Sequence, residues 1–176
     1  MDEMLRGAVP DGILRSVSHP TLGKPPRSLQ VGFPEAAARL RTERSRLASR
    51  ALEAAVDADP TFRTRYDEDG LRNLLGDAEV FVDRLALCVA GNDPHWLKEF
   101  ADMTAPVFRR RKVAMDDVVR LLEGLRAGAR GVLSDAETVP ADAAIDEAVG
   151  VFKWYRRLAG DARKRNPILA ALYKGA

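Results

Sequence analysis

The chain has 176 residues, 46% of them hydrophobic and 31% charged, so it is long enough for one domain with a buried core and too apolar for a disordered chain. Its 28 basic and 26 acidic residues leave a net charge of +2, with no strongly basic segment, which argues against binding to nucleic acid or to an anionic membrane. No run reaches the roughly 18 apolar residues of a membrane span, the first residues lack the apolar stretch of a signal peptide, and a single cysteine excludes an intramolecular disulfide, so we expect a cytoplasmic protein.

Residues 1–34 are expected to form an irregular N-terminal arm ahead of a helical domain over residues 35–176. Five prolines and four glycines rule out a long helix in this arm. Apolar residues nevertheless recur through it, among them Leu22, Leu29 and Phe33. We interpret these three side chains as contacts to the protein's own bundle or to a partner.

The first helix is expected over residues 35–58, between Pro34 and Asp59-Pro60. Its apolar stripe is thin, and the remaining positions are mostly Arg and Glu, so we expect it to be the outermost helix. A second helix is predicted over residues 67–90, with Asp67 as its N-cap and Gly91-Asn92 as its C-cap signal. So much of its circumference is apolar that it should be central.

The third helix is expected to open at Asp93-Pro94 and to end in a basic run. Its larger apolar side chains recur at helical spacing, which predicts that they form the buried stripe. They are Trp96, Phe100, Met103 and Val107. A proline inside the pattern, Pro106, predicts a kink near Met103.

Two more long helices are predicted over residues 115–133 and 140–165, each with apolar residues at alternating steps of three and four. Glycines within the first of them, including Gly124, would permit close approach of a neighbouring helix. A short apolar helix over residues 168–173 could dock onto the rest. The prediction is an all-α fold, an antiparallel bundle of about five helices in which short loops join neighbours, with a globin-like arrangement as the alternative.

His95 is the candidate cofactor-binding residue, because an imidazole beside Trp96 and Phe100 resembles an axial ligand in an apolar cleft. It also lies one turn before Glu99, a spacing that can hold a metal. His19 is the only other histidine, however, and His95 stands at a helix start where solvent is close. We therefore predict no metal site and no resident cofactor, and keep a haem- or chromophore-binding sensor as an alternative.

Cys88 falls on the apolar flank of the second predicted helix, where a free cysteine is usually a small buried hydrophobe. No Cys/His pairing, phosphate-binding glycine loop, nucleophile elbow or zinc-protease motif is present. We therefore predict that the protein is not an enzyme.

The strongest charge run is Arg109-Arg110-Arg111-Lys112, at the end of the third predicted helix. One interpretation is a docking surface for an acidic partner or an anion contact. The other is a set of solvated cations that complement the helix dipole. We name the four residues as candidate partner-binding residues and leave both interpretations open.

Residues 100–133 carry a resemblance to a known family. An aromatic-rich helix ends in a polar turn, and Val113, Met115, Asp117 and Val118 then open a long amphipathic helix. This stretch resembles the N-terminal helical sensor domains of stressosome-type co-antagonist proteins and related bacterial regulators. The resemblance implies a bundle that senses or relays signals through dimerisation, and the effector domain that follows in such proteins is not found in this sequence.

Together these patterns predict a non-enzymatic regulatory or protein-interaction module. It would present a bundle face and the N-terminal arm to a protein partner or to a second copy of itself. The alternatives are a ligand- or cofactor-binding helical sensor and an accessory subunit of a large assembly.

Overall fold

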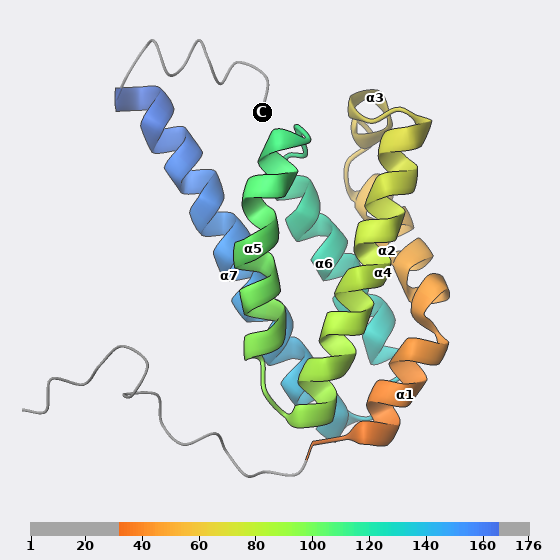
Figure 1. Ribbon diagram of the computed structural model, residues 1–176. Helices are drawn as coiled ribbons and strands as arrows, with labels where there is room; N and C mark the ends of the chain where they lie inside the picture. Colours follow the sequence, from red (N-terminus) through yellow and green to blue (C-terminus); the bar gives the residue numbers. More distant parts are fainter. Residues whose placement is uncertain (1–31, 166–176) are drawn as a thin grey trace, which may run out of the picture.

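The computed structural model describes residues 32–165, with side chains as far as Leu158, and this part of the chain contains helices and no strand (Figure 1). The predicted all-α fold class is therefore confirmed. The helices are, in chain order, α1 (Pro34–Thr42), α2 (Arg44–Ala58), α3 (Phe62–Arg65), α4 (Glu68–Gly91), α5 (His95–Arg110), α6 (Met115–Arg130) and α7 (Asp135–Arg165). None of these helices is long and apolar enough to cross a membrane.

The first predicted helix is two helices, because the chain turns at Glu43, whose backbone (φ −91°, ψ 8°) leaves the helical geometry. The turn lets α1 pack along α4 while α2 packs along both α4 and α6. That this segment is the outermost one stays a prediction, because both of its helices keep an exposed charged side while their apolar stripe is buried. Its thin stripe is made largely of alanines that are fully buried, including Ala48, Ala51 and Ala55.

Small residues explain how α2 can pack against α6 with such a narrow apolar stripe. A Cβ atom at Gly124 in α6 would lie 2.6 Å from the carbonyl oxygen of Ala51 in α2, so only glycine allows this approach. Gly128, one turn later, lies against Leu47. The two helices therefore come close together at Gly124 and Ala51, and buried leucines such as Leu47 fill the space on either side.

The ends of α4 follow the predicted signals. The Asp67 carboxylate accepts a hydrogen bond from the Gly70 N–H at 2.8 Å, as an N-cap should. At the other end Asn92 adopts the left-handed conformation (φ 47°), and the Asp93 N–H donates to the Cys88 carbonyl at 3.0 Å. The chain reverses there, and α5 returns beside α4 (Figure 1).

The core of the α4, α5 and α7 group is aromatic. Phe81 from α4 packs against Phe108 of α5 and Phe152 of α7, with ring centroids 6.2 Å away in both cases. Although α5 and α6 follow one another through a short loop, they touch little, and α5 packs chiefly against α7. The expectation that short loops make sequential helices neighbours therefore holds for α4–α5 and fails for α5–α6.

The helix α7 begins at Asp135, earlier than the predicted start near Pro140. Its first turn is closed by Glu137, whose carboxylate accepts a hydrogen bond from the Ser134 N–H at 2.8 Å. This is one half of a capping box, Ser-x-x-Glu, which is present in the sequence. Pro140 is tolerated inside the helix and is buried. The predicted short helix over residues 168–173 lies outside the described residues.

Candidate functional site

The outward side of α5 carries large apolar side chains in contact with solvent. Met103 is 61% exposed, Trp96 39% and Val107 37%. The predicted buried stripe of this helix is therefore wrong, apart from Phe100, which is partly buried against the core. The residues that face the core are Leu97, Ala101, Ala105 and Phe108.

The two alanines explain the rotation of α5 away from the predicted orientation. A helix that presents small residues to its neighbours can approach them closely, so the adjacent large residues are carried to the outside. The helix also runs through Pro106 as one continuous element.

The neighbouring helix α4 extends this apolar surface. Val80 and Leu87 are 39% and 36% exposed. They share one side of α4 with Arg84, whose guanidinium lies 5.1 Å from the centroid of the Phe100 ring in α5. Beneath them, the rings of Phe81 and Phe100 meet edge to face with centroids 5.5 Å apart. We call the exposed side chains of Val80, Leu87, Trp96, Met103 and Val107 the α4–α5 face.

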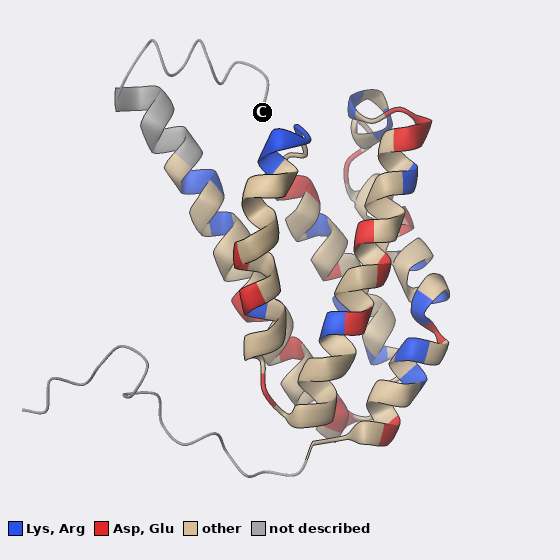
Figure 2. Cartoon of the chain, in the orientation of Figure 1, with Lys and Arg blue, Asp and Glu red and all other residues tan. Residues whose placement is uncertain are grey.

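The α4–α5 face is bordered by charges of both signs. Glu99 and Asp102 are exposed in the N-terminal half of α5, and Arg110 is exposed at its C-terminal end. In Figure 2 the red segments of α5 lie in the half that follows the α4–α5 loop, and the largest blue segment lies at the opposite end. Along the outer side of α5, Glu99 thus lies toward the N-terminal end of the apolar stripe and Arg110 at its C-terminal end, with Lys98 and Arg84 as further cations nearby.

The four predicted basic residues, Arg109 to Lys112, have different surroundings in the structure. Arg111 pairs with Asp77 of α4 at 2.9 Å and lies over the Phe108 ring, so it fastens the end of α5 to α4. Lys112 takes the left-handed conformation (φ 60°) that ends α5, and the Val113 N–H donates to the Phe108 carbonyl. Arg110 is exposed and makes no ion pair within the described residues, and its role in partner binding stays a prediction.

Of the predicted arm contacts, Leu22 and Leu29 lie outside the described residues. Phe33 is described: its N–H donates to the Val89 carbonyl at 2.9 Å, and its ring packs against the core. The preceding Gly32 lies so close to Ala90 that a Cβ there would overlap the Ala90 carbonyl group. The arm thus joins the bundle at the C-terminal end of α4, and Phe33 contributes to the fold.

His95 is the first residue of α5, and its side chain is 39% exposed. Its Nε2 lies 3.9 Å from a Glu99 oxygen, and within the described residues no three potential metal ligands cluster. The backbone N–H of His95 donates a hydrogen bond to the Asp93 carboxylate at 3.0 Å. Cofactor binding by His95 stays a prediction, and the imidazole's surroundings do not strengthen it.

Cys88 is fully buried, as predicted for a small core residue. Burial raises the pKa of its thiol to about 11, so the thiol is protonated at neutral pH. This environment does not favour a nucleophilic role.

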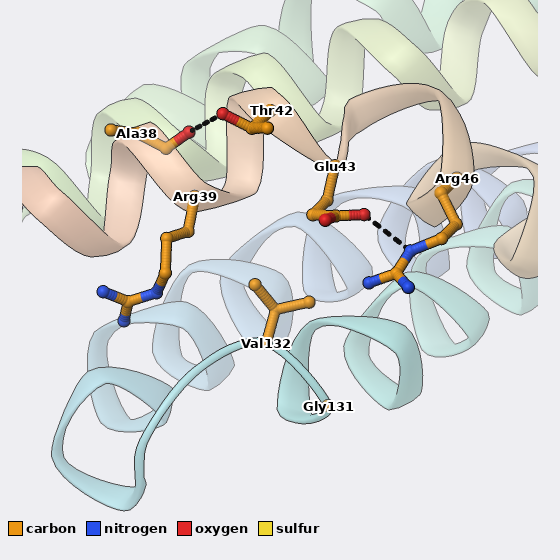
Figure 3. Close-up of a pocket in the computed structure, with 7 residues that line it drawn as sticks. All are labelled: Ala38, Arg39, Thr42, Glu43, Arg46, Gly131 and Val132. Carbon is orange, nitrogen blue, oxygen red and sulfur yellow. Dashed lines mark hydrogen bonds and ion pairs between the residues drawn. The ribbon is translucent and has the colours of Figure 1, made fainter.

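A shallow open depression of about 330 Å³ lies where the α1–α2 turn meets the end of α6 (Figure 3). Its polar lining is already engaged within the protein: Arg46 pairs with Glu43 at 2.6 Å, and Arg39 pairs with Glu137 of α7. The Thr42 hydroxyl donates a hydrogen bond to the Ala38 carbonyl at 3.1 Å, and the other lining residues, Ala38, Gly131 and Val132, have no polar side chain. The depression therefore lacks the convergent, unengaged polar groups of a ligand site.

The one buried charged side chain among the described residues is Asp117, at the start of α6. Its carboxylate accepts hydrogen bonds from Arg65 at 2.8 Å and 3.1 Å, from Arg120 at 2.8 Å and from the Tyr66 hydroxyl at 2.8 Å. Tyr66 in turn accepts a hydrogen bond from the Ala114 N–H at 3.1 Å. Every lone pair is used, so this cluster ties the α3 corner to α6 and leaves no group for a ligand.

Compared with known protein families and with curated proteins, the sequence matches none of them. The resemblance to stressosome-type sensor domains therefore stays a prediction. The residues that sequence reasoning misplaced are Trp96, Met103 and Val107, which were predicted to be buried and are exposed. The available signal was the second apolar stripe of α5, formed by Leu97, Ala101, Ala105 and Phe108, which competes with the stripe of larger residues.

Proposed function

We propose that the protein is a non-enzymatic protein-interaction module that uses the α4–α5 face as its contact surface. The observation that carries the proposal is the exposure of Trp96, Met103 and Val107 along one side of α5 while alanines of the same helix are buried. A row of large apolar side chains on one helix pair is typical of an interface, whereas scattered single residues are not.

Aromatic residues, Met and Arg are enriched at the centres of protein interfaces. The face holds Trp96 and Met103, and Arg84 and Arg110 adjoin it. The well-packed aromatic layer beneath it, including Phe81, provides a rigid support for the contact. A rigid surface loses little conformational entropy on binding.

The proposal keeps the regulatory character that the resemblance over residues 100–133 implies, and it keeps a cytoplasmic location. For the arrangement of the helices we propose a bundle rather than a globin-like fold. The close contacts of α2 with α6 and of α5 with α7 support this choice. The predicted role of Leu22 and Leu29 in partner binding belongs to the same proposal. Of the predicted basic run, Arg110 is the residue that the proposal retains.

The test compares binding by the natural protein with binding by a doubly substituted face, Trp96→Ser with Met103→Ser. We expect this variant to lose association with any protein partner, including another copy of itself, as measured by quantitative affinity capture and sedimentation. The matched control is Val139→Ser, because Val139 is 68% exposed but lies at the start of α7, outside the face. If the double variant and the control retain the same associations, the α4–α5 face is not the contact surface.

A further inference from the structure

We propose that the occupant of the α4–α5 face is a second copy of this chain, with the two α5 helices antiparallel about a two-fold axis near Met103. This inference rests on the proposed function and names the partner. It follows from the order of apolar and charged residues along α5 and from their exposure.

The apolar residues of the outer stripe have the spacing that a pairing helix needs. Trp96, Met103 and Arg110 are each seven residues apart and therefore share one line along the helix. Glu99 and Val107 lie beside that line, one turn on either side of Met103. The most exposed large apolar side chain of the stripe, Met103, stands at its centre.

The charges make the stripe complementary to itself in one orientation. In an antiparallel pair centred on Met103, Arg110 of one copy faces Trp96 of the other, where a guanidinium can stack on an indole ring. Glu99 of the second copy is three residues from its Trp96, on the side of Met103. It is therefore displaced from Trp96 by only about 4.5 Å along the helix axis, since a helix rises about 1.5 Å per residue. A parallel pair would instead place acid beside acid and base beside base.

The flanking helix α4 supports the same arrangement. Val80 and Leu87 extend the apolar surface on the side of α5 that adjoins α4. Two-fold symmetry would bring four helices together, α4 and α5 from each copy, which enlarges the area removed from water. A two-fold interface uses the same patch on both copies, so one self-complementary face is sufficient.

Other occupants fit the charges less well. An anionic membrane or a nucleic acid would be repelled by Glu99 and Asp102, which border the apolar stripe. A partner of a single charge would be attracted at one end of the stripe and repelled at the other. A second copy, related to the first by a two-fold axis, places Glu99 near Arg110 at both ends of the stripe.

The first experiment measures the mass of the full chain by sedimentation equilibrium at micromolar to millimolar concentration. We expect a dimer of twice the chain mass of 19.3 kDa. Met103→Glu should yield a monomer with an unchanged circular-dichroism spectrum, because it places two carboxylates together at the axis. Val139→Glu, an equally polar change outside the face, should remain dimeric.

The register is tested by exchanging charges. Glu99→Arg alone and Arg110→Glu alone should each weaken the dimer by at least about tenfold, because each places like charges opposite one another. The double exchange should restore most of the affinity. Rescue depends on an antiparallel contact between these two positions and would not follow from a general loss of stability.

A third measurement does not depend on the stability of charged variants. Met103→Cys, treated with diamide as the oxidant, should form a disulfide-linked dimer on a non-reducing gel, while Val139→Cys should not. The native Cys88 is buried and should contribute little background. The disulfide also fixes the axis near residue 103.

The outcomes separate the two proposals. A wild-type chain that stays monomeric throughout the concentration range overturns the second-copy proposal. If that monomer still binds another protein and loses it in the Trp96→Ser/Met103→Ser variant, the proposed function stands. A dimer that Met103→Glu leaves intact, or charge variants without rescue, places the dimer contact elsewhere and also overturns the inference.

Discussion

The α2–α6 pair and the α4–α5 pair solve the packing problem in opposite ways. Between α2 and α6, Gly124 lies against the Ala51 backbone, the large apolar side chains such as Leu47 are buried, and no large exposed apolar side chain remains on either helix. Along α5 small residues also face inward, but large ones are left outside. The comparison teaches that small residues, as well as large ones, decide which side of a helix is buried.

The charged groups of the α2–α6 pair and those of the α4–α5 pair also differ in their exposure. At the end of the α2–α6 pair, the Asp117 carboxylate accepts all of its hydrogen bonds from Arg65, Arg120 and Tyr66. The charges that border the α4–α5 face are exposed, and Arg110 has no ion-pair partner within the described residues. The polar groups of the first pair therefore point into the protein, whereas the second pair presents exposed apolar side chains and charges.

The sharpest test of this contrast lies within α5. Leu97→Ala removes a fully buried side chain and should lower the free energy of unfolding by about 3 kcal/mol. Met103→Ala, in the same helix, should change it by less than about 0.5 kcal/mol in the monomer, because Met103 is largely exposed. Urea denaturation at low protein concentration measures both. Equal losses would mean that the two stripes of α5 are buried alike.

A smaller effect is expected from glycine replacement at the closed side. Gly124→Ala should cost about 2 kcal/mol, because its Cβ would lie 2.6 Å from the Ala51 carbonyl oxygen and the backbone must shift. Gly76→Ala in α4 is the matched control: a Cβ there meets nothing within 4 Å. This control should be stabilised by up to about 1 kcal/mol, since alanine favours helix. A neutral Gly124→Ala would show that α2 and α6 are not so closely packed.

The smallest effect concerns pH at the α2–α3 corner. Hydrogen bonds from Thr61 and Arg65 lower the pKa of Asp59 from 3.8 to about 2. The folded state therefore gains stability from the ionised carboxylate above pH 3.8 and loses it as the pH falls towards 2.

The stability difference between the natural protein and Asp59→Asn should be present near neutral pH and should shrink in acid, as measured by urea denaturation at a series of pH values. A difference that is the same at every pH would mean that the charge of Asp59 has no part in it.

Much of the fold could be predicted from local signals. The caps at Asp67 and Asn92 set the ends of α4, and the long apolar stripes of α4, α6 and α7 marked those helices. The start of α7 was missed although its signal was present, because Ser134 and Glu137 form a capping pattern ahead of Pro140. The break at Glu43 carried no such local signal.

The sequence by itself therefore determined the class of the fold, most of the helices and a core of sufficient size, because these depend on local propensity and helical period. Only the tertiary structure decided which of two competing stripes of α5 faces inward. That choice depends on how closely α4 and α7 can approach Ala101 and Ala105, and no local pattern encodes the distance between helices. The same choice brought Trp96, Met103 and Val107 to the surface, where they form the proposed interface.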